Sequence, residues 1–517
     1  MQAELVCLSD VFRGTTILKA LLQYLLSETL AGREGELSQY SIGSAVFDLP
    51  GNFSPESNPV VRVTASRLRR ALFSYYAGDG AGDPIVIELP KGAYALRFAY
   101  RAVDSPLRRP ILGLMEFEGL DLDSEWVLFP LLLAEELSVA MSGIGLLQLM
   151  GPFSRRLLNE ERLEPVSLGK RYAVDLVLDG SVQRKAEELV IRTRLLDGTS
   201  GVQIWARKDV IAADRAGFSA FEESLMRELA VEVGADHAVS DIYFASLARV
   251  KPVHQWSVME AVLCGRMYFK DFSAEMLEKS LAALRRAVVE FPEEALPHAT
   301  LAVVLGSACF ETFWTGPVPC EEVAHHARLA DELDPQSPWS VIALETSAVI
   351  RHRDDELKAL ADTVGELGQT SALLVGSTGI WMCYRKLDVT RALAMIREAM
   401  ERNPHYPRLF HLGPCLHALE CGDLDGALRE IDAYGSPQDR CDALIRGAVA
   451  SFRGDQAEAR IQWKRLLRNC PDFALRGYDL LQRFFHDDYC QLICGAFNEV
   501  GAGIEMPVAE VRVRELC

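Results

Sequence analysis

Proline recurs at nearly regular intervals in the second half of this sequence, and the interval restricts what that half can fold into. The prolines at 292, 335, 404, 437 and 471 are separated by 43, 69, 33 and 34 residues. The gap of 69 is close to two periods, with one proline missing near Gln369. A period near 34 residues is typical of stacked helix pairs in which proline ends the second helix. We therefore expect residues 250–490 to be almost wholly helical.

Small residues recur in step with these prolines, as close packing between paired helices requires. Alanine stands five or twelve residues before a proline and glycine stands 24 before, at Ala287, Ala330, Ala392, Ala399, Ala459, Gly413 and Gly447. Together with the period, this pattern resembles a degenerate tetratricopeptide array of about five or six helix pairs. The resemblance implies an α-solenoid that binds a protein or peptide partner on its concave surface. The 43-residue gap predicts an insertion at Phe310–Cys320.

The stretch Asn58–Tyr76 has the pattern of an amphipathic helix when successive residues are placed about 100° apart. The apolar arc contains Val61, Ala65, Leu68, Leu72, Tyr75 and Tyr76. The opposite arc contains Arg62, Ser66, Arg67, Arg69, Arg70 and Ser74. Four guanidinium groups on one face suit a phosphate-lined groove, and arginine can also read guanine edges. The same pattern also fits an ordinary amphipathic helix whose polar face is solvated.

The segments around this helix predict a small α+β domain in residues 1–105. Thr16–Leu30 reads as a helix, and Ser41–Phe47 is a short apolar segment. Ile85–Leu89 and Tyr94–Tyr100 read as two strands, joined by a tight turn at Pro90-Lys91-Gly92. Three helices followed by a β-hairpin is the order of a winged helix.

Two motifs make this similarity more specific. Ser66–Leu72 and Lys91–Tyr94 resemble the recognition helix and the hairpin of response-regulator-type winged-helix DNA-binding domains. Short matches at Tyr40–Gly43, Val46-Phe47, Val61–Val63 and Tyr75-Tyr76 also resemble an N-terminal domain of many proteobacterial proteins. In those proteins the remaining chain is TolB-like and tetratricopeptide.

The winged-helix resemblance implies a set of DNA-binding residues, because in that family the third helix enters the major groove. Carried over to this sequence, Arg62, Arg67 and Arg70 are candidate groove residues, and Ser66 and Ser74 are weaker candidates. Lys91, at the tip of the hairpin, is a candidate phosphate contact. Arg69 belongs to the same candidate set, but it lies near the core boundary, where a structural role is the alternative.

Residues 106–240 alternate between predicted strands and helices and so form an α/β domain. Strands are expected at Pro110–Glu118, Leu146–Pro152, Asp175–Arg184, Glu188–Leu196 and Gln203–Val210, and helices at Pro130–Ser142 and Val166–Tyr172. The segments Leu176–Arg184, Arg192–Asp197 and Gly201–Ala206 resemble motifs of the TolB amino-terminal-like domain. The resemblance implies a sheet that supports interdomain packing or binds a ligand or partner.

Length and charge limit the classes of protein that remain. A chain of 517 residues is too long for one core, so about three domains are expected. The net charge of −19 argues against non-specific coating of nucleic acid or anionic membrane. Residues 1–105 carry 10 basic and 11 acidic side chains, whereas the rest of the chain carries 44 and 62. The N-terminal segment can therefore still have a locally basic face.

The sequence predicts a cytoplasmic protein that does not contact a membrane. The N-terminus lacks a basic signal-peptide region, and the longest apolar run, Trp126–Ala134, is too short to span a bilayer. Twelve cysteines without C-x-x-C spacing indicate reduced thiols.

No motif predicts an enzyme, a cofactor or a metal centre. Gly143-Ile144-Gly145 lacks the third glycine and the lysine of nucleotide-binding loops. A cluster of potential metal ligands is formed by His411, Cys415, His417 and Cys421. Its two pairs would lie about 200° apart around a helix and could not all reach one ion.

These observations predict a multidomain, mainly α protein. Its parts are a winged helix in 1–105, an α/β domain in 106–240, helical repeats in 250–490 and a C-terminal tail in 491–517. The expected function is that of a bacterial one-component transcription regulator in signal transduction. In this interpretation the winged helix binds double-stranded DNA, with homodimerisation plausible, and the remainder senses a ligand or protein partner. The alternative is an interaction scaffold whose winged helix no longer binds DNA.

Overall fold

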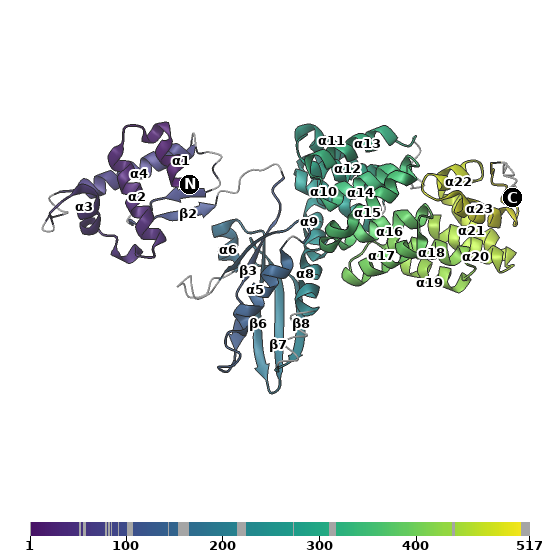
Figure 1. Ribbon diagram of the computed structural model, residues 1–517, viewed down its shortest axis with the longest axis horizontal. Helices are drawn as coiled ribbons and strands as arrows, with labels where there is room; N and C mark the ends of the chain where they lie inside the picture. Colours follow the sequence, from purple (N-terminus) through teal and green to yellow (C-terminus); the bar gives the residue numbers. More distant parts are fainter. Residues whose placement is uncertain are drawn as a thin grey trace. The chain divides into compact units, whose positions relative to one another are not determined.

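A computed structural model describes residues 2–50, 53–54, 58–77, 80, 83, 85–90, 93–100, 107–142, 144–153, 165–214, 224–271, 273–309, 317–436 and 440–507. The described protein is mainly helical, with a small mixed sheet in the middle of the chain (Figure 1). Its internal contacts define two compact units. The first comprises residues 1–115, 153–179 and 195–203, and the second comprises 116–152, 180–194 and 204–517. The division crosses strands of the sheet.

The N-terminal segment consists of short helices followed by a β-hairpin. The elements are α1 (Gln2–Leu8), η1 (Asp10–Phe12), α2 (Thr16–Leu30), η2 (Glu34–Glu36), α3 (Gln39–Phe47), α4 (Val60–Ala77), β1 (Ile85–Glu88) and β2 (Arg97–Tyr100). The predicted helix at Thr16–Leu30 is confirmed to the residue. The segment at 41–47 is also helical and begins at Gln39, because Ser38 and Ser41 cap each other's backbone there. The two strands are antiparallel, from Ile85 opposite Tyr100 to Glu88 opposite Arg97.

One hydrophobic core joins these N-terminal elements. It is built from buried side chains of α1 to α4 and of the hairpin, including Phe12, Leu21, Ile42, Leu68 and Ile87. Polar contacts tie the hairpin to the helices: the backbone N–H of Leu96 donates to Thr29 Oγ1 (3.2 Å), and that of Ile87 donates to Tyr76 Oη (3.0 Å). In this N-terminal segment, one face of α4 therefore packs against the core and the other faces solvent.

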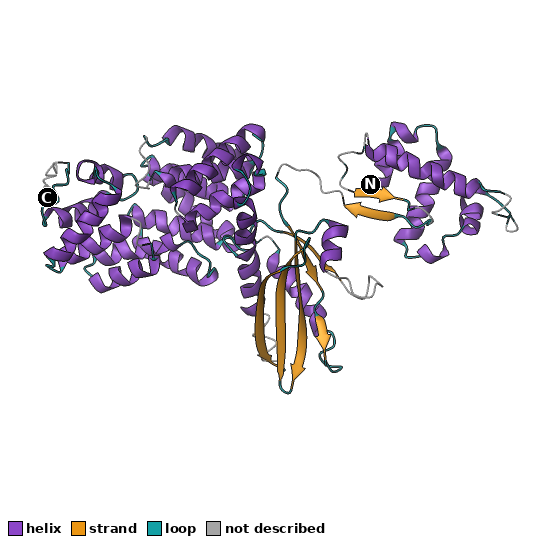
Figure 2. Ribbon diagram, turned by 180° about the vertical axis from the view of Figure 1, so that it is seen from behind, coloured by secondary structure: helices purple, strands orange, loops and turns teal. Residues whose placement is uncertain are grey.

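The middle of the chain forms a mixed six-stranded sheet. Its strands are β3 (Ile111–Met115), β4 (Glu118–Leu120), β5 (Gln148–Phe153), β6 (Leu176–Lys185), β7 (Glu188–Asp197) and β8 (Gln203–Ala212). The strand order is β5-β3-β6-β7-β8, and β4 also pairs with β6. Both β3 and β4 run parallel to β6, with Leu112 opposite Leu176 and Glu118 opposite Ser181. The three long strands β6, β7 and β8 lie side by side (Figure 1), and Figure 2 shows all strands in orange.

Among the described residues, four helices lie in or directly after this region: α5 (Phe129–Met141), α6 (Pro165–Tyr172), α8 (Met226–Gly234) and α9 (Val239–Arg249). The strands and helices that the sequence predicts here are confirmed, with ends that differ by a few residues. Helices α5 and α8 contact each other. Strand β8 is tied to α8 because Arg207 forms ion pairs with Glu228 and Glu232, and Trp205 Nε1 donates to Glu232 (3.0 Å).

The rest of the described chain is a helical array, 258–498, preceded by η4 (Val253–Gln255). Its helices are α10 (Val258–Asp271), α11 (Ala274–Glu290), α12 (Ala295–Ala308), α13 (Cys320–Leu333), α14 (Pro338–Ile350), α15 (Asp354–Thr370), α16 (Ala372–Tyr384), α17 (Val389–Arg402), α18 (Leu412–Glu420, after η5, Arg408–His411), α19 (Leu424–Tyr434), α20 (Arg440–Phe452), α21 (Gln456–Asn469), α22 (Phe473–Gln482) and α23 (Asp487–Asn498). The expectation of an almost wholly helical region is confirmed for the described residues. They form seven consecutive helix pairs, rather than the five or six expected.

The proline period coincides with the ends of helices. Helices α11, α13, α17 and α21 each end two residues before a proline of the series, while α15 ends at Thr370, close to the missing position. Pro437 and most of the expected insertion at 310–320 lie outside the described residues. Every alanine of the pattern is buried. Three aspartates, Asp388, Asp423 and Asp455, cap the second helices of successive pairs, with side chains that accept from backbone N–H groups.

A short segment near the C-terminus contacts helices far away in sequence. This return segment, 483–486, joins α22 to α23. The guanidinium of Arg483 donates to the carbonyl of Cys309 (3.0 Å), and the backbone N–H of His486 donates to the carbonyl of Tyr384 (2.7 Å). The array thus has contacts between helices far apart in the sequence in addition to those between neighbouring helices.

Candidate functional site

Helix α4 packs one face onto the N-terminal core, as its sequence predicts. All six residues of the predicted apolar arc are buried, with no side chain more than 6% exposed. Thr64 is buried as well, at 4% exposure. The helix continues to Ala77, and its aromatic end is fixed because Tyr75 Oη donates to Asp83 Oδ2 (2.5 Å). The orientation of the opposite face is therefore set by packing.

The opposite face of α4 presents arginine and serine side chains to solvent. Arg62, Ser66, Arg67, Arg70 and Ser74 are all exposed. Within the described part of the chain, Arg62, Arg67 and Arg70 form no ion pair with a carboxylate. The three guanidiniums can therefore contact an external anion without first giving up such a pair. Lys91, the candidate at the hairpin tip, lies outside the described residues.

Arg69 differs from these three arginines because its side chain is held by the protein. Its Nε lies 3.0 Å from the Leu89 carbonyl oxygen and 3.1 Å from that of Pro90, and its Nη2 donates to the Ala93 carbonyl (3.1 Å). These contacts join α4 to the connection between the two hairpin strands. They support the structural alternative for Arg69, in which it positions the hairpin relative to the exposed face of α4.

The half-buried Tyr94 belongs to the same connection. Burial raises the pKa of its phenol, and the positive charges of Arg69 and Arg62 oppose that rise. Arg62 therefore lies close enough to Tyr94 to act on it electrostatically. The exposed face of α4 and the connection between the two hairpin strands are thus neighbours in this part of the chain.

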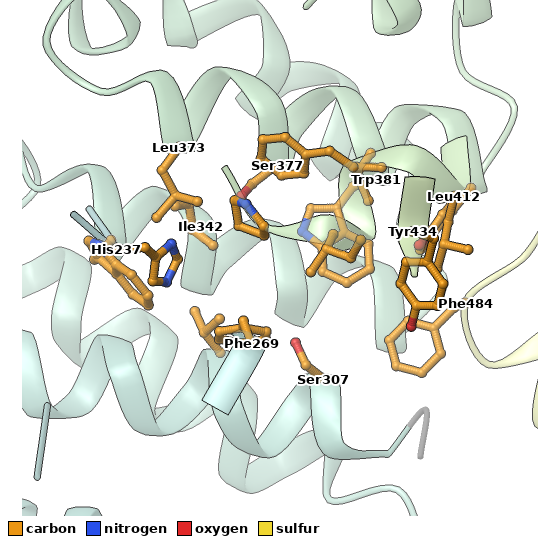
Figure 3. Close-up of a pocket in the computed structure, with 17 residues that line it drawn as sticks. His237, Phe269, Ser307, Ile342, Leu373, Ser377, Trp381, Leu412, Tyr434 and Phe484 are labelled. Atoms are coloured by element: carbon orange, nitrogen blue, oxygen red, sulfur yellow. The ribbon is translucent and has the colours of Figure 1, made fainter. Parts of the chain in front are cut away.

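The second candidate site is a cavity in the helical array, and the sequence did not predict it. A cavity of about 80 Å³ is lined mainly by the first helices of successive pairs, α10, α12, α14, α16 and α18. Aromatic side chains form a large part of its wall, among them Phe269, Trp339, Trp381, Phe410 and Phe484. Figure 3 shows them beside aliphatic side chains such as Ile342 and Leu373. Phe484 comes from the return segment, and its ring stacks on that of Trp381 at 5.9 Å between ring centres.

Next to the cavity, a buried polar cluster joins α8 and α9 to the array. The carboxylate of Asp236 accepts from Arg266 Nη1 (2.9 Å) and from Trp339 Nε1 (3.2 Å), and its carbonyl accepts from the Asn403 side chain (3.1 Å). Burial raises the pKa of Asp241 to about 7 and lowers the pKa of its neighbour His237. His237 also lines the cavity, at one end of the group in Figure 3.

The sequence pattern did not predict this cavity. Its lining residues are spread from 237 to 484, so no local motif contains more than a few of them. One available signal was the number of aromatic residues on helices that the repeat pattern places in equivalent positions. The cluster around Asp236 had no signal beyond an acidic residue beside a histidine.

Comparison with known proteins adds no assignment to either site, since no family model matches the chain and no curated protein matches it. Among the described residues, no helix is both long enough and apolar enough to cross a bilayer. A search of the same residues for three or more histidine, cysteine, aspartate or glutamate side chains placed to share a metal ion finds no such group.

Proposed function

We propose that this protein is a one-component transcription regulator that binds double-stranded DNA through its N-terminal segment. In this proposal the segment is a winged helix, the middle sheet belongs to a TolB-N-like domain, and the helical array is a tetratricopeptide-like α-solenoid. The middle domain and the array then sense a ligand or a protein partner. The proposal includes a cytoplasmic location and allows a homodimer on DNA.

The exposed face of α4 is the observation that carries this proposal. Because the buried stripe of α4 is fully packed, Arg62, Arg67 and Arg70 all extend from the face that points to solvent. Arginine donates two parallel hydrogen bonds to phosphate or to a guanine edge, so a row of arginines on one helix face suits the major groove. An interaction scaffold would have no need for guanidiniums that lack acidic partners, although its array could still bind a protein.

The test is recovery of genomic DNA fragments by the purified full-length protein at about 0.15 M salt, close to physiological ionic strength. We expect enrichment of a sequence motif. Replacing both arginines, Arg67→Ala with Arg70→Ala, should weaken binding to that motif by about 5- to 150-fold per arginine, since each contact contributes about 1–3 kcal/mol.

The matched control removes two exposed arginines from the array instead, Arg429→Ala with Arg453→Ala, which changes the net charge equally. This variant should bind DNA like the wild type. Equal binding by the Arg67/Arg70 variant, or no enriched motif from a folded protein, would contradict the proposal. Either result would favour the scaffold interpretation.

A further inference from the structure

The cavity in the helical array has the composition of a binding site for an uncharged molecule. None of the described residues that line it is an aspartate, glutamate, lysine or arginine. A charged ligand would lose its hydration there without gaining a charged partner, which is costly in an apolar environment. The aromatic rings of the wall instead offer flat apolar surface that suits another ring.

A few polar groups interrupt this apolar wall. Ser307 and Ser377 lie on opposite walls (Figure 3) and are partly exposed, and neither hydroxyl has a hydrogen-bond partner among the described residues. Nε1 of Trp381 and Nδ1 of His237 are likewise buried without a partner in the described structure. His237 Nε2 lies 3.1 Å from the Arg266 carbonyl oxygen, which can only accept, so Nε2 carries the proton and Nδ1 is an acceptor.

We propose that this cavity binds a small, uncharged aromatic molecule that carries a hydroxyl or carbonyl group. The ring packs among the aromatic side chains, and its polar group hydrogen-bonds to the serine hydroxyls. A larger apolar cavity, of about 150 Å³, admits benzene, so a cavity of about 80 Å³ limits the ligand to no more than one ring. A sparse set of polar groups in an apolar cavity is typical of small-molecule sites.

This inference deepens the proposed function, because it names the class of ligand that the sensing region takes. The cavity borders the connection between α8 and α9, because His237 lines it. The adjacent Asp236 accepts a hydrogen bond from Trp339, which lines the cavity too. A molecule in the cavity would therefore contact the residues that connect α8 to the array.

The test uses the full-length protein without DNA. Phenol and benzyl alcohol are the neutral probes, benzene is the apolar probe, and benzoate and benzylammonium are the charged ones. We expect the neutral probes to raise the thermal midpoint and to change tryptophan fluorescence, because Trp339 and Trp381 line the cavity. The charged probes should do neither. Absence of binding by the neutral probes, or equal binding of the charged ones, would overturn the proposal.

Two substitutions assign the binding to this cavity. Ser377→Leu fills it and should abolish binding of every probe, whereas Ser246→Leu makes the same change on the exposed face of α9 and should have no effect. Ser307→Ala removes only a hydroxyl and should weaken phenol binding about threefold to tenfold while leaving benzene unchanged. Binding that survives both Ser377→Leu and Ser307→Ala would place the ligand elsewhere. Since no DNA is present, failure of the DNA proposal would leave this result standing, and the reverse also holds.

Discussion

At the scale of single residues, arginines on the same helix have different roles according to what their guanidiniums contact. Arg67 and Arg70 are exposed on α4. The guanidinium of Arg69, by contrast, donates hydrogen bonds to three backbone carbonyls of the connection between the hairpin strands. Helical periodicity placed all of them on the polar side. It could not show that the chain returns to meet Arg69, because that contact depends on a hairpin some twenty residues later.

Glu345 in α14 is a second residue whose behaviour follows from its surroundings. It is completely buried, and burial raises the pKa of its carboxyl to about 8. Its Oε1 lies 2.5 Å from Thr378 Oγ1, which also lies 2.9 Å from the Leu374 carbonyl oxygen. One hydroxyl proton cannot serve both acceptors. A protonated Glu345 satisfies both contacts, because it donates to the threonine while the threonine donates to the carbonyl.

This carboxyl should make stability depend on pH. The folded protein keeps its proton up to about pH 8, whereas the unfolded chain releases it near 4.5, so the folded state binds more protons between these values. The free energy of unfolding should therefore fall as pH rises from 4.5 to 8, by about 1.4 kcal/mol per unit at most. Glu345→Gln should remove this part of the dependence, as measured by thermal midpoints at pH 5 and pH 8. Parallel pH profiles for both proteins would show that Glu345 is ionised when folded.

At the scale of helices, some neighbouring helices of the array pack so closely that only glycine fits between them. A Cβ atom on Gly379 of α16 would lie 2.8 Å from the carbonyl oxygen of Ala392 in α17, and backbone cannot move aside as a side chain can. By contrast, a Cβ on Gly365 of α15 would have no neighbour within 4 Å. Both glycines lie inside helices, so sequence alone does not distinguish them.

The two glycines should therefore respond in opposite directions to alanine. Gly379→Ala should lower the free energy of unfolding by about 1–3 kcal/mol, because α16 and α17 must separate. Gly365→Ala should raise it by up to about 1 kcal/mol through helix propensity alone. Thermal midpoints of the two variants provide the measurement. A stabilised Gly379→Ala protein would mean that this helix pair is less closely packed than described.

Elements were easier to predict than sites, for a physical reason. The buried stripe of α4 follows from the helical period of its own sequence, and the ends of α11, α13, α17 and α21 follow from prolines beside them. The cavity residues Phe269, Trp381 and Phe484 meet only after seven helix pairs have stacked. Periodicity therefore identified which side chains are buried, but it could not identify which of them surround an empty space.

At the scale of the whole molecule, charge is distributed unevenly along the chain. Residues 1–105 are nearly neutral, whereas the rest has a net charge of −18 from 44 basic and 62 acidic residues. An acidic body of this size repels DNA, so the affinity proposed for α4 has to arise at short range from a few guanidiniums. This arrangement favours selective over non-specific binding.

The salt dependence of DNA binding should report those few contacts. With Arg62, Arg67 and Arg70 on phosphates, the slope of log K against log salt concentration should be about −3 or shallower. The Arg67/Arg70 variant should show a slope shallower by about 2, whereas the Arg429/Arg453 variant should match the wild type. Fluorescence anisotropy with a recovered DNA fragment measures all three proteins. Identical slopes would mean that the arginines of α4 do not contact phosphate.

The return segment, 483–486, has a consequence for how this protein can change over evolution. An open stack of repeats can gain or lose a unit, since each unit contacts only its neighbours. Here Arg483 reaches Cys309 and His486 reaches Tyr384, so α12, α16 and the last helices must keep a fixed spacing. Duplication or deletion of one helix pair between them would separate these partners and remove Phe484 from the cavity wall. These contacts therefore favour change by substitution within helix pairs over gain or loss of a whole pair.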